Sequence, residues 1–204
     1  MTSVRVGDKY VYPTKIVCIG RNYLEHIKEL NNVVPEQMVV FNKPPSAISP
    51  QLVAFDQEPL HYEAEMCFLI KDGAYTAVAL GLDLTKRNLQ SQLKANGLPW
   101  ERAKGFDGSA LFSRFVDLTG VEVDTLEIEL LINCVRVQKG TVKQMIYSPH
   151  TILEELNTYT SLQDGDIIMT GTPPGVGEIH VGDVFLGRIK AGEKTLVEAE
   201  WLAE

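Results

Sequence analysis

The sequence predicts a β-rich α+β fold, and three observations support this class. Short apolar or alternating runs, bounded by glycine and proline, outnumber helical segments. The length of 204 residues suits one domain with a sizeable core. The chain contains no repeat, low-complexity tract or clear linker. We therefore expect residues 1–204 to form a single domain in which strands dominate and a few short helices pack on them.

The predicted strands are runs rich in β-branched, aromatic and other apolar residues. Turn-forming residues separate them, for example Pro13 and the segments 71–73 and 139–140. The run over residues 127–137 alternates well, which predicts one long strand. In chain order, the predicted strands cover residues 9–12, 15–19, 38–41, 52–55, 61–70, 76–82, 127–137, 167–169, 183–189 and 196–201.

Three segments have apolar residues at helical spacing, namely residues 23–30, 86–96 and 149–159. Each follows a residue whose side chain can accept a hydrogen bond from the first turn. Asn22 precedes the first helix, with Glu25 as its capping-box partner. Thr85 precedes the second helix and Ser148 the third. Gly97 is suited to end the second helix in a left-handed conformation.

Two glutamates stand out in the strand predicted over residues 61–70. Glu63 and Glu65 are two positions apart, so they project from the same face of a strand, while the alternate positions 64, 66, 68 and 70 form an apolar, core-facing row. Two carboxylates this close repel each other unless a cation lies between them, and a hard divalent cation is a common partner. The alternative is an antiparallel strand with one solvent-exposed face, on which two glutamates are ordinary.

Asp83 supplies a third carboxylate. It follows the strand predicted over residues 76–82, and successive strands usually lie side by side. Three carboxylates without histidine or cysteine suit Mg²⁺, Mn²⁺ or Ca²⁺ rather than zinc. Three ligands also leave coordination positions for water or substrate, as a catalytic ion requires. The alternative is that Asp83 simply ends a strand.

His26 and Glu29 are three residues apart on the first predicted helix, so their side chains are neighbours. The carboxylate can hold one imidazole nitrogen and leave the other free to take a proton from water. The alternative is an ordinary surface pair. Spacing alone favours this alternative, because such pairs are common on helices.

The composition narrows the partners and the location. The formal net charge is -8 and no basic cluster is present, which argues against nucleic acid and anionic membranes as partners. No apolar run approaches the roughly 20 residues that span a bilayer, and the first residues do not form a signal region. Cys18, Cys67 and Cys134 lie scattered in apolar runs, which predicts buried free thiols in a reducing compartment. We therefore expect a cytoplasmic protein.

Several short motifs occur together in one order. They are Gly20-Arg21-Asn22-Tyr23 with His26 and Glu29, Glu63-x-Glu65, Leu82-Asp83-Leu84-Thr85-x-Arg87 with Gln90, Pro99-Trp100 with Lys104, and Thr170-Gly171-Thr172-Pro173 with Gly175-x-Gly177. Each motif is weak alone, but together they resemble the fumarylacetoacetate hydrolase family over about residues 16–190. The likeness is strongest to its short acylpyruvase and oxaloacetate-decarboxylase-like branch. It implies the mixed β-sandwich roll of that family and a homodimer.

The resemblance also implies roles for individual residues. The metal ligands would be Glu63, Glu65 and Asp83, and the ion would be Mg²⁺ or Mn²⁺. His26 and Glu29 would form the general-base dyad, and Lys104 would stabilise charge that develops on the substrate. The substrate contacts would come from Arg21, Arg87, Gln90 and Thr172.

The activity that the resemblance implies is divalent-metal-dependent hydrolysis of a C–C bond in an acylpyruvate-type 2,4-dioxo acid, through a metal-stabilised pyruvate enolate. Decarboxylation or tautomerisation of oxaloacetate, and isomerisation of a 2-hydroxymuconate-type acid, are alternatives that use the same site. A non-catalytic, metal-stabilised binding module is an alternative of another class. The pair of His26 and Glu29 speaks against that module, because a binding protein needs no base. The expected partner is a small 2-oxo acid.

Overall fold

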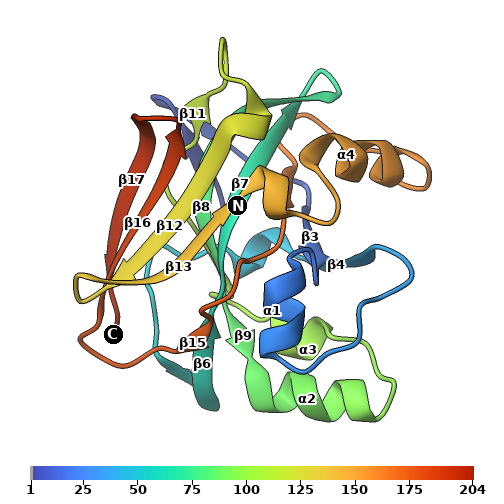
Figure 1. The fold of residues 1–204 in the computed structure, drawn as a ribbon, viewed down its shortest axis with the longest axis vertical. Helices are drawn as coiled ribbons and strands as arrows, with labels where there is room; N and C mark the ends of the chain where they lie inside the picture. The colour runs from blue at the N-terminus through green and yellow to red at the C-terminus, as the bar shows by residue number, and fades with distance from the viewer. Residues whose placement is uncertain (1) are drawn as a thin grey trace.

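The computed structural model describes residues 2–204 and confirms the strand-rich α+β fold (Figure 1). Its largest sheet, called here the first sheet, has seven strands in the order β10-β8-β7-β14-β3-β4, with β11 beside β8. All neighbours in it are antiparallel except β14 and β3. Its strands are β3 (Ile16–Gly20), β4 (Val39–Lys43), β7 (Ala64–Lys71), β8 (Ala74–Asp83), β10 (Ala110–Phe112), β11 (Val116–Asp117) and β14 (Ile167–Met169).

A second sheet of four strands packs on one face of the first (Figure 1). Its order is β13-β12-β16-β17, and its strands are β12 (Leu126–Ile132), β13 (Val135–Thr141), β16 (Val184–Ala191) and β17 (Lys194–Leu202). The main core lies between the sheets and includes Met66 and Leu80 from the first and Ile128 and Phe185 from the second. A Cβ atom on Gly187 would lie 2.1 Å from Leu80, so only glycine allows this close approach.

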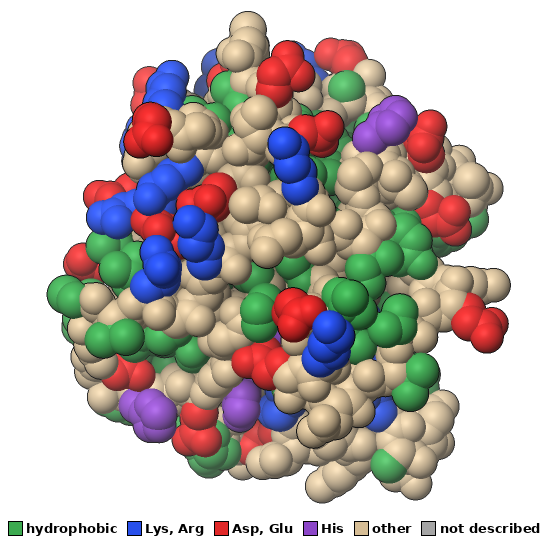
Figure 2. Space-filling model, viewed as in Figure 1, with side chains coloured by type: hydrophobic (Ala, Val, Ile, Leu, Met, Phe, Trp, Pro, Cys, Tyr) green, Lys and Arg blue, Asp and Glu red, His purple; other side chains and the backbone are tan. Residues whose placement is uncertain are grey.

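Acidic and basic side chains are interleaved on the outer face of the second sheet (Figure 2). Arg188, for example, donates to Glu198 at 2.6 Å and to Glu129 at 3.2 Å. This mixture agrees with the absence of a basic cluster in the sequence. Such a surface offers no continuous positive patch for a polyanion.

Two small sheets complete the strands. One contains β5 (Phe55–Asp56), β6 (Glu58–Tyr62), β9 (Thr85–Lys86) and β15 (Gly177–Glu178), and the other is the hairpin of β1 (Val4–Val6) and β2 (Lys9–Val11). Strand β6 leads directly into β7, and Glu63 is the one residue between them. The strand predicted over residues 61–70 is therefore split at Glu63.

The helices lie on the side of the first sheet that faces away from the second sheet (Figure 1). They are α1 (Leu24–Glu29), α2 (Arg87–Ala95), α3 (Glu101–Lys104) and α4 (Pro149–Asn157), with 3₁₀ turns at Pro45–Ala47, Val123–Thr125 and Val142–Gln144. The three predicted helices are present with ends that differ by one or two residues, whereas α3 was not predicted. No helix among residues 2–204 is long and apolar enough to cross a membrane.

Tertiary contacts replace two of the three predicted helix caps. Asn22 does not cap α1, because its side-chain oxygen instead accepts a hydrogen bond from the Tyr147 amide at 2.7 Å, while its NH₂ group donates to the carbonyl oxygens of Tyr147 and Thr170 at 2.9 and 2.8 Å. Thr85 does not cap α2, because its hydroxyl oxygen lies 2.6 Å from the ammonium group of Lys104. Only Ser148 caps as predicted, accepting a hydrogen bond from the first turn of α4 at 3.2 Å.

The predicted strand over residues 127–137 is in fact a hairpin. Asn133 and Cys134 form the turn between β12 and β13, and their φ angles are 51° and 66°. Two consecutive positive φ angles define the tight hairpin turn that normally favours glycine, and here no glycine marked it. Cys134 is therefore exposed, so the prediction of three buried cysteines is correct only for Cys18 and Cys67.

Both faces of β7 are buried, so the alternative of one solvent-exposed face is wrong. Ala64, Met66 and Phe68 face the main core as predicted, while Cys67 and Leu69 belong to a second core cluster on the other face. A register shift after Leu69 moves position 70 out of the predicted row and into a third cluster beneath α4. The side chain of Glu65 thus enters a buried environment.

Candidate active site

The three carboxylates predicted as metal ligands converge at one end of the first sheet. Asp83 ends β8, Glu65 lies on the neighbouring β7, and Glu63 immediately precedes β7. The backbone amide of Asp83 donates to the carbonyl oxygen of Glu63 at 2.9 Å, which fixes the two chain segments. One carboxylate oxygen from each residue lies within 4.8 Å of the others, and all three side chains are buried. We call this group the acidic triad.

Two cationic side chains contact the acidic triad from the helices. The ammonium group of Lys104, at the end of α3, donates to Glu63 at 2.9 Å and to Asp83 at 2.7 Å. Its third contact is the hydroxyl oxygen of Thr85 at 2.6 Å, so all three protons of the ammonium are used. Arg87, at the start of α2, makes a short charge-assisted hydrogen bond to Glu63. These pairs anchor both helices over the end of the sheet.

A third cation, Lys43, is fully buried behind the acidic triad. Its ammonium nitrogen lies 2.8 Å from Oδ1 of Asp83. The same ammonium group also donates to the backbone carbonyl oxygens of Leu84, Lys104 and Ser109. Lys43 and Asp83 therefore form a fully buried ion pair that is further held by the backbone.

The pKa shifts of Glu63 and Glu65 differ in direction, because only Glu63 has cationic partners. Burial raises the pKa of Glu63, but Lys104 and Arg87 outweigh this effect and hold that pKa well below its usual value. Burial, Asp83 and Glu63 together raise the pKa of Glu65 well above its usual value. Glu65 accepts one hydrogen bond, from the Gly171 amide at 2.7 Å, and has no cationic partner within the described residues.

The residues present fit a hard divalent cation. Such an ion would supply the positive charge that Glu65 lacks. A donor set made only of carboxylate oxygens suits Mg²⁺ or Mn²⁺ better than a soft metal.

His26 and Glu29 form the predicted pair. Nδ1 of His26 lies 3.2 Å from one carboxylate oxygen of Glu29, and the other oxygen accepts a hydrogen bond from the Gly175 amide at 2.9 Å. At Gly175 the φ angle is +103°, and a Cβ atom there would lie 1.9 Å from the carbonyl oxygen of Val137. Glycine is therefore required at this position, and the loop that contains it holds Glu29 in place.

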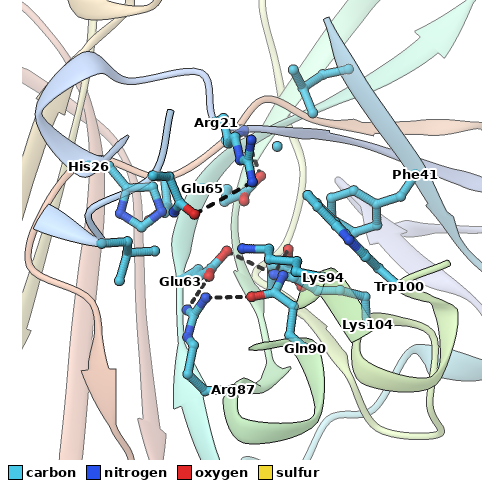
Figure 3. Close-up of a pocket in the computed structure, with 17 residues that line it drawn as sticks. Arg21, His26, Phe41, Glu63, Glu65, Arg87, Gln90, Lys94, Trp100 and Lys104 are labelled. Carbon is cyan, nitrogen blue, oxygen red and sulfur yellow. Dashed lines mark hydrogen bonds and ion pairs between the residues drawn. The ribbon is translucent and has the colours of Figure 1, made fainter. Parts of the chain in front are cut away.

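The environment of His26 keeps its imidazole neutral. Burial lowers the pKa of His26, and the opposing effects of Glu63 and Glu29 do not reverse this shift. With Nδ1–H donating to Glu29, the free acceptor is Nε2. His26 lines the same pocket as the acidic triad (Figure 3). A neutral imidazole in this position can accept a proton from a bound molecule.

Helix α2 presents one polar face to the pocket. Arg87, Gln90 and Lys94 are three and four residues apart and all line it (Figure 3). Arg87 donates to the side-chain oxygen of Gln90 at 2.8 Å, which orients the guanidinium. Because Gln90 is buried, this arrangement is rigid.

The other predicted substrate residues also reach the pocket. The hydroxyl of Thr172 donates to the carbonyl oxygen of Ala64 at 2.8 Å and accepts from the Gln138 amide at 2.8 Å. Arg21 follows β3 and lies over the ring of Trp100, with 5.8 Å between guanidinium carbon and ring centroid. Every residue predicted for the site thus lines this one pocket, except Glu29, which lies behind His26 as its partner.

Sequence reasoning missed two lysines of the site. Lys43 precedes two prolines and lies just beyond the strand predicted over residues 38–41, although on β4 it points to the same buried side as Phe41. Lys94 lies on the same helical face as Arg87 and Gln90, and that spacing was the signal that could have revealed it.

Comparison with known proteins places the chain in a family. A family profile described as fumarylacetoacetate (FAA) hydrolase C-terminal matches residues 15–202. The chain belongs to the fumarylacetoacetate hydrolase family. Oxaloacetate tautomerases are similar in sequence. The Escherichia coli (strain K12) protein is 36% identical over 84% of this chain and 87% of its own length. The mitochondrial oxaloacetate tautomerase from Arabidopsis thaliana is 36% identical over 100% of this chain and 97% of its own length.

The fold is also found in solved structures of this family. Fumarylpyruvate hydrolase from Pseudomonas aeruginosa, in complex with Mn²⁺ and pyruvate, superposes with a TM-score of 0.89 at 28% identity, covering 99% of this chain and 95% of that one. The fold and the family predicted from the sequence are therefore confirmed, and so is the prediction of a metal-dependent enzyme. These relatives are named for different reactions.

Proposed function

We propose that this chain is a Mg²⁺- or Mn²⁺-dependent enzyme that acts on small 2-oxo acids, and that it catalyses keto–enol tautomerisation of oxaloacetate-type acids. The observation that carries the proposal is a neutral His26, held by Glu29, in the same buried pocket as the acidic triad. The names of the relatives with 36% identity support the choice of reaction. Tautomerisation needs a base at C3 of the acid and no attacking water, and the pocket supplies the base.

Each part of the pocket has its own role in this reaction. A divalent cation held by the acidic triad would supply a Lewis acid that polarises the 2-oxo group and makes the C3 protons more acidic. Arg87, oriented by Gln90, binds the adjacent carboxylate. Nε2 of His26 accepts the proton that leaves C3, and Glu29 stabilises the imidazolium that forms. The 2-oxo oxygen gains one proton as C3 loses one, so the ketone becomes the enol without change of composition.

Hydrolysis of an acylpyruvate is the second candidate. It is favoured by the structural similarity to fumarylpyruvate hydrolase and by the same base, which can instead take a proton from water. The hydroxide adds to the distal carbonyl carbon, the C3–C4 bond breaks, and C3 takes up the proton. Decarboxylation of oxaloacetate also breaks that bond, but CO₂ leaves and no water attacks.

One set of assays separates these reactions. The purified chain is mixed with oxaloacetate, following enol absorbance and CO₂ release, and with acetylpyruvate, following loss of the dioxo chromophore. Each assay is run with Mg²⁺, with Mn²⁺ and with a chelator. We expect metal-dependent acceleration of the keto–enol exchange that exceeds both CO₂ release and hydrolysis. Failure to accelerate any of the three reactions with either metal would reject the proposal, and faster hydrolysis would favour the second candidate.

We further propose that the chain works as a homodimer, as the sequence resemblance implies. Sedimentation equilibrium of the purified protein tests this. A mass near 45 kDa is expected, since one chain has a mass of 22.7 kDa, whereas a mass of one chain would contradict it.

A further inference from the structure

Two cations in the outer part of the pocket have no acidic partner. Arg21 comes from the connection between β3 and α1, and Lys94 comes from α2 (Figure 3). Both lie against the ring of Trp100, with 5.8 Å from the Arg21 guanidinium carbon and 5.0 Å from the Lys94 ammonium to its centroid. Within residues 2–204, neither has a carboxylate oxygen within 4.0 Å, although cations deeper in the pocket do.

The hydrogen-bonding capacity of Arg21 is poorly used. Its Nε is buried and has no acceptor. Its other two nitrogens make contacts of 3.4 and 3.5 Å, to the carbonyl oxygen of Val33 and the side chain of Asn32. Its φ angle is +57°, a left-handed conformation that costs a non-glycine residue about 1–2 kcal/mol. Such strain is found where a side chain is held for binding.

The surroundings of Lys94 also contain more positive than negative charge. Burial, and then Arg21 and Arg87, lower its pKa to about 8.

The lining of the pocket as a whole also carries more positive than negative side chains. Its lining carries four cationic side chains (Arg21, Arg87, Lys94 and Lys104) against the three carboxylates of the acidic triad. A bound divalent cation would increase the positive excess, although the whole chain has a net charge of -8.

We propose that Arg21 and Lys94 bind a second carboxylate of the substrate, so that the pocket selects 2-oxo dicarboxylates over 2-oxo acids whose far end is uncharged. The inference rests on the proposed function, which places the 2-oxo acid end of the substrate at the acidic triad and Arg87. The far end then reaches Trp100, where its methylene groups contact the ring and its carboxylate contacts both cations. Lys94 is in this account a specificity-determining residue that sequence reasoning did not identify.

Kinetics with matched substrates test the role of Lys94. Oxaloacetate is compared with its 4-methyl ester, which lacks the second charge, in the metal-loaded enzyme and in the variants Lys94→Met and Lys94→Arg. We expect Lys94→Met to raise KM for oxaloacetate by about tenfold or more, as loss of one charge-assisted hydrogen bond does, while kcat and the KM for the ester change less than twofold. Lys94→Arg should restore most of the affinity.

The matched control is Lys28→Met, which removes an exposed lysine of α1 that pairs with Glu25 outside the pocket. It should leave both substrates unaffected. An equal loss with oxaloacetate and the ester in Lys94→Met would mean that Lys94 has only a structural role. If Lys94→Met keeps its affinity for both oxaloacetate and the ester, Lys94 does not bind the substrate. Both results overturn the proposal.

Binding without turnover separates this proposal from the proposed function. Trp100 and Trp201 are the tryptophans of the chain, so a Trp201→Phe background leaves Trp100 as the fluorescent reporter. The Mg²⁺-loaded protein is titrated with 2-oxoglutarate and with 2-oxopentanoate, which has the same carbon skeleton without the second carboxylate. We expect tighter binding of 2-oxoglutarate by about tenfold or more, and loss of that preference in Lys94→Met. If the enzyme turns over no 2-oxo acid but keeps this preference, only the proposed function fails. If it turns them over without the preference, this inference fails.

Discussion

The two ends of the pocket differ in how fully their charged side chains are paired. At the inner end, the acidic triad is buried with Lys43, Lys104 and Arg87, and most charges there have partners within 3 Å. At the outer end, Arg21 and Lys94 both lie over the ring of Trp100 and have no acidic partner within the described part of the chain. We call these regions the inner site and the outer site.

The difference suggests a division of labour. Burying a charge is costly unless it is paired and hydrogen-bonded, so the dense pairing of the inner site makes a rigid set of ligands. The outer site leaves two cations without a partner, and a bound anion would provide one. We propose that the reaction takes place at the inner site and that the outer site selects the substrate.

The largest effect is expected from breaking the inner site. Glu65→Gln removes the carboxylate that has no cationic partner and should lower kcat/KM by about 10³-fold or more, because a catalytic ion contributes several kcal/mol. Steady-state assays at saturating Mn²⁺ measure this. Glu127→Gln, which alters a half-buried ion pair with Lys139 far from the pocket, is the matched control and should have no effect. Retention of a tenth of the activity by Glu65→Gln would contradict the metal assignment.

Removal of the base should have a smaller effect than loss of a ligand and should spare metal binding. His26→Ala should lower turnover by about 10²–10⁴-fold, the usual contribution of a general base, with Mn²⁺ affinity within twofold of the unmodified chain. Turnover and Mn²⁺ titration are measured on the same preparations. If Mn²⁺ affinity falls with turnover, His26 belongs to the inner site as a structural residue and its role as a base is wrong.

The pH profile separates the two regions. His26 must be neutral to act, and burial lowers its pKa, so kcat/KM should stay high down to a pH below the ordinary histidine range and fall only as His26 becomes protonated.

On the alkaline side, Lys94 must be charged to bind a second carboxylate. Its pKa is about 8, with Arg21, Arg87, Lys104 and Glu63 as the charged groups around it. The kcat/KM for oxaloacetate should therefore fall by about tenfold as the pH rises through about 8, whereas the 4-methyl ester shows no such limb. Lys94→Arg should remove the limb, because arginine does not titrate there. An identical alkaline limb for both substrates would contradict the outer site.

The smallest effect is expected far from the pocket. Cys134→Gly relieves the positive φ angle of 66° at the β12–β13 turn and should stabilise the fold by up to about 1 kcal/mol, since part of the gain is offset by the greater chain entropy of glycine. Chemical denaturation measures the change in free energy of unfolding. Activity should not change, and a change in the ratio of rates with oxaloacetate and its ester would show that specificity is not confined to the outer site.

Local patterns were sufficient to predict much of the inner site. Strand alternation placed Glu63 and Glu65 together, neighbouring strands brought Asp83 beside them, and helical spacing paired His26 with Glu29. Each of these relations depends on residues close in sequence or on strands that follow one another, which is the range over which a sequence pattern is informative.

Relations between distant segments were not predictable. Asn22 has the sequence setting of a cap, but its amide is used by Tyr147 and Thr170, more than a hundred residues away. Lys43 looks like an exposed lysine before a proline, yet it is fully buried, because Asp83 and three carbonyl oxygens surround it in the folded chain. Propensity describes what a residue can do locally, and tertiary partners decide which option is used.

The central claim is that the acidic triad binds one divalent cation that engages the 2-oxo acid. Its most direct test is a Mn²⁺ titration followed by electron paramagnetic resonance, in the unmodified chain and in Asp83→Asn, with and without oxalate. The account predicts one Mn²⁺ per unmodified chain, tighter Mn²⁺ binding when oxalate is present, because linkage is reciprocal, and loss of the site in Asp83→Asn. Absence of Mn²⁺ binding by the unmodified chain, or equal binding by Asp83→Asn, would contradict it.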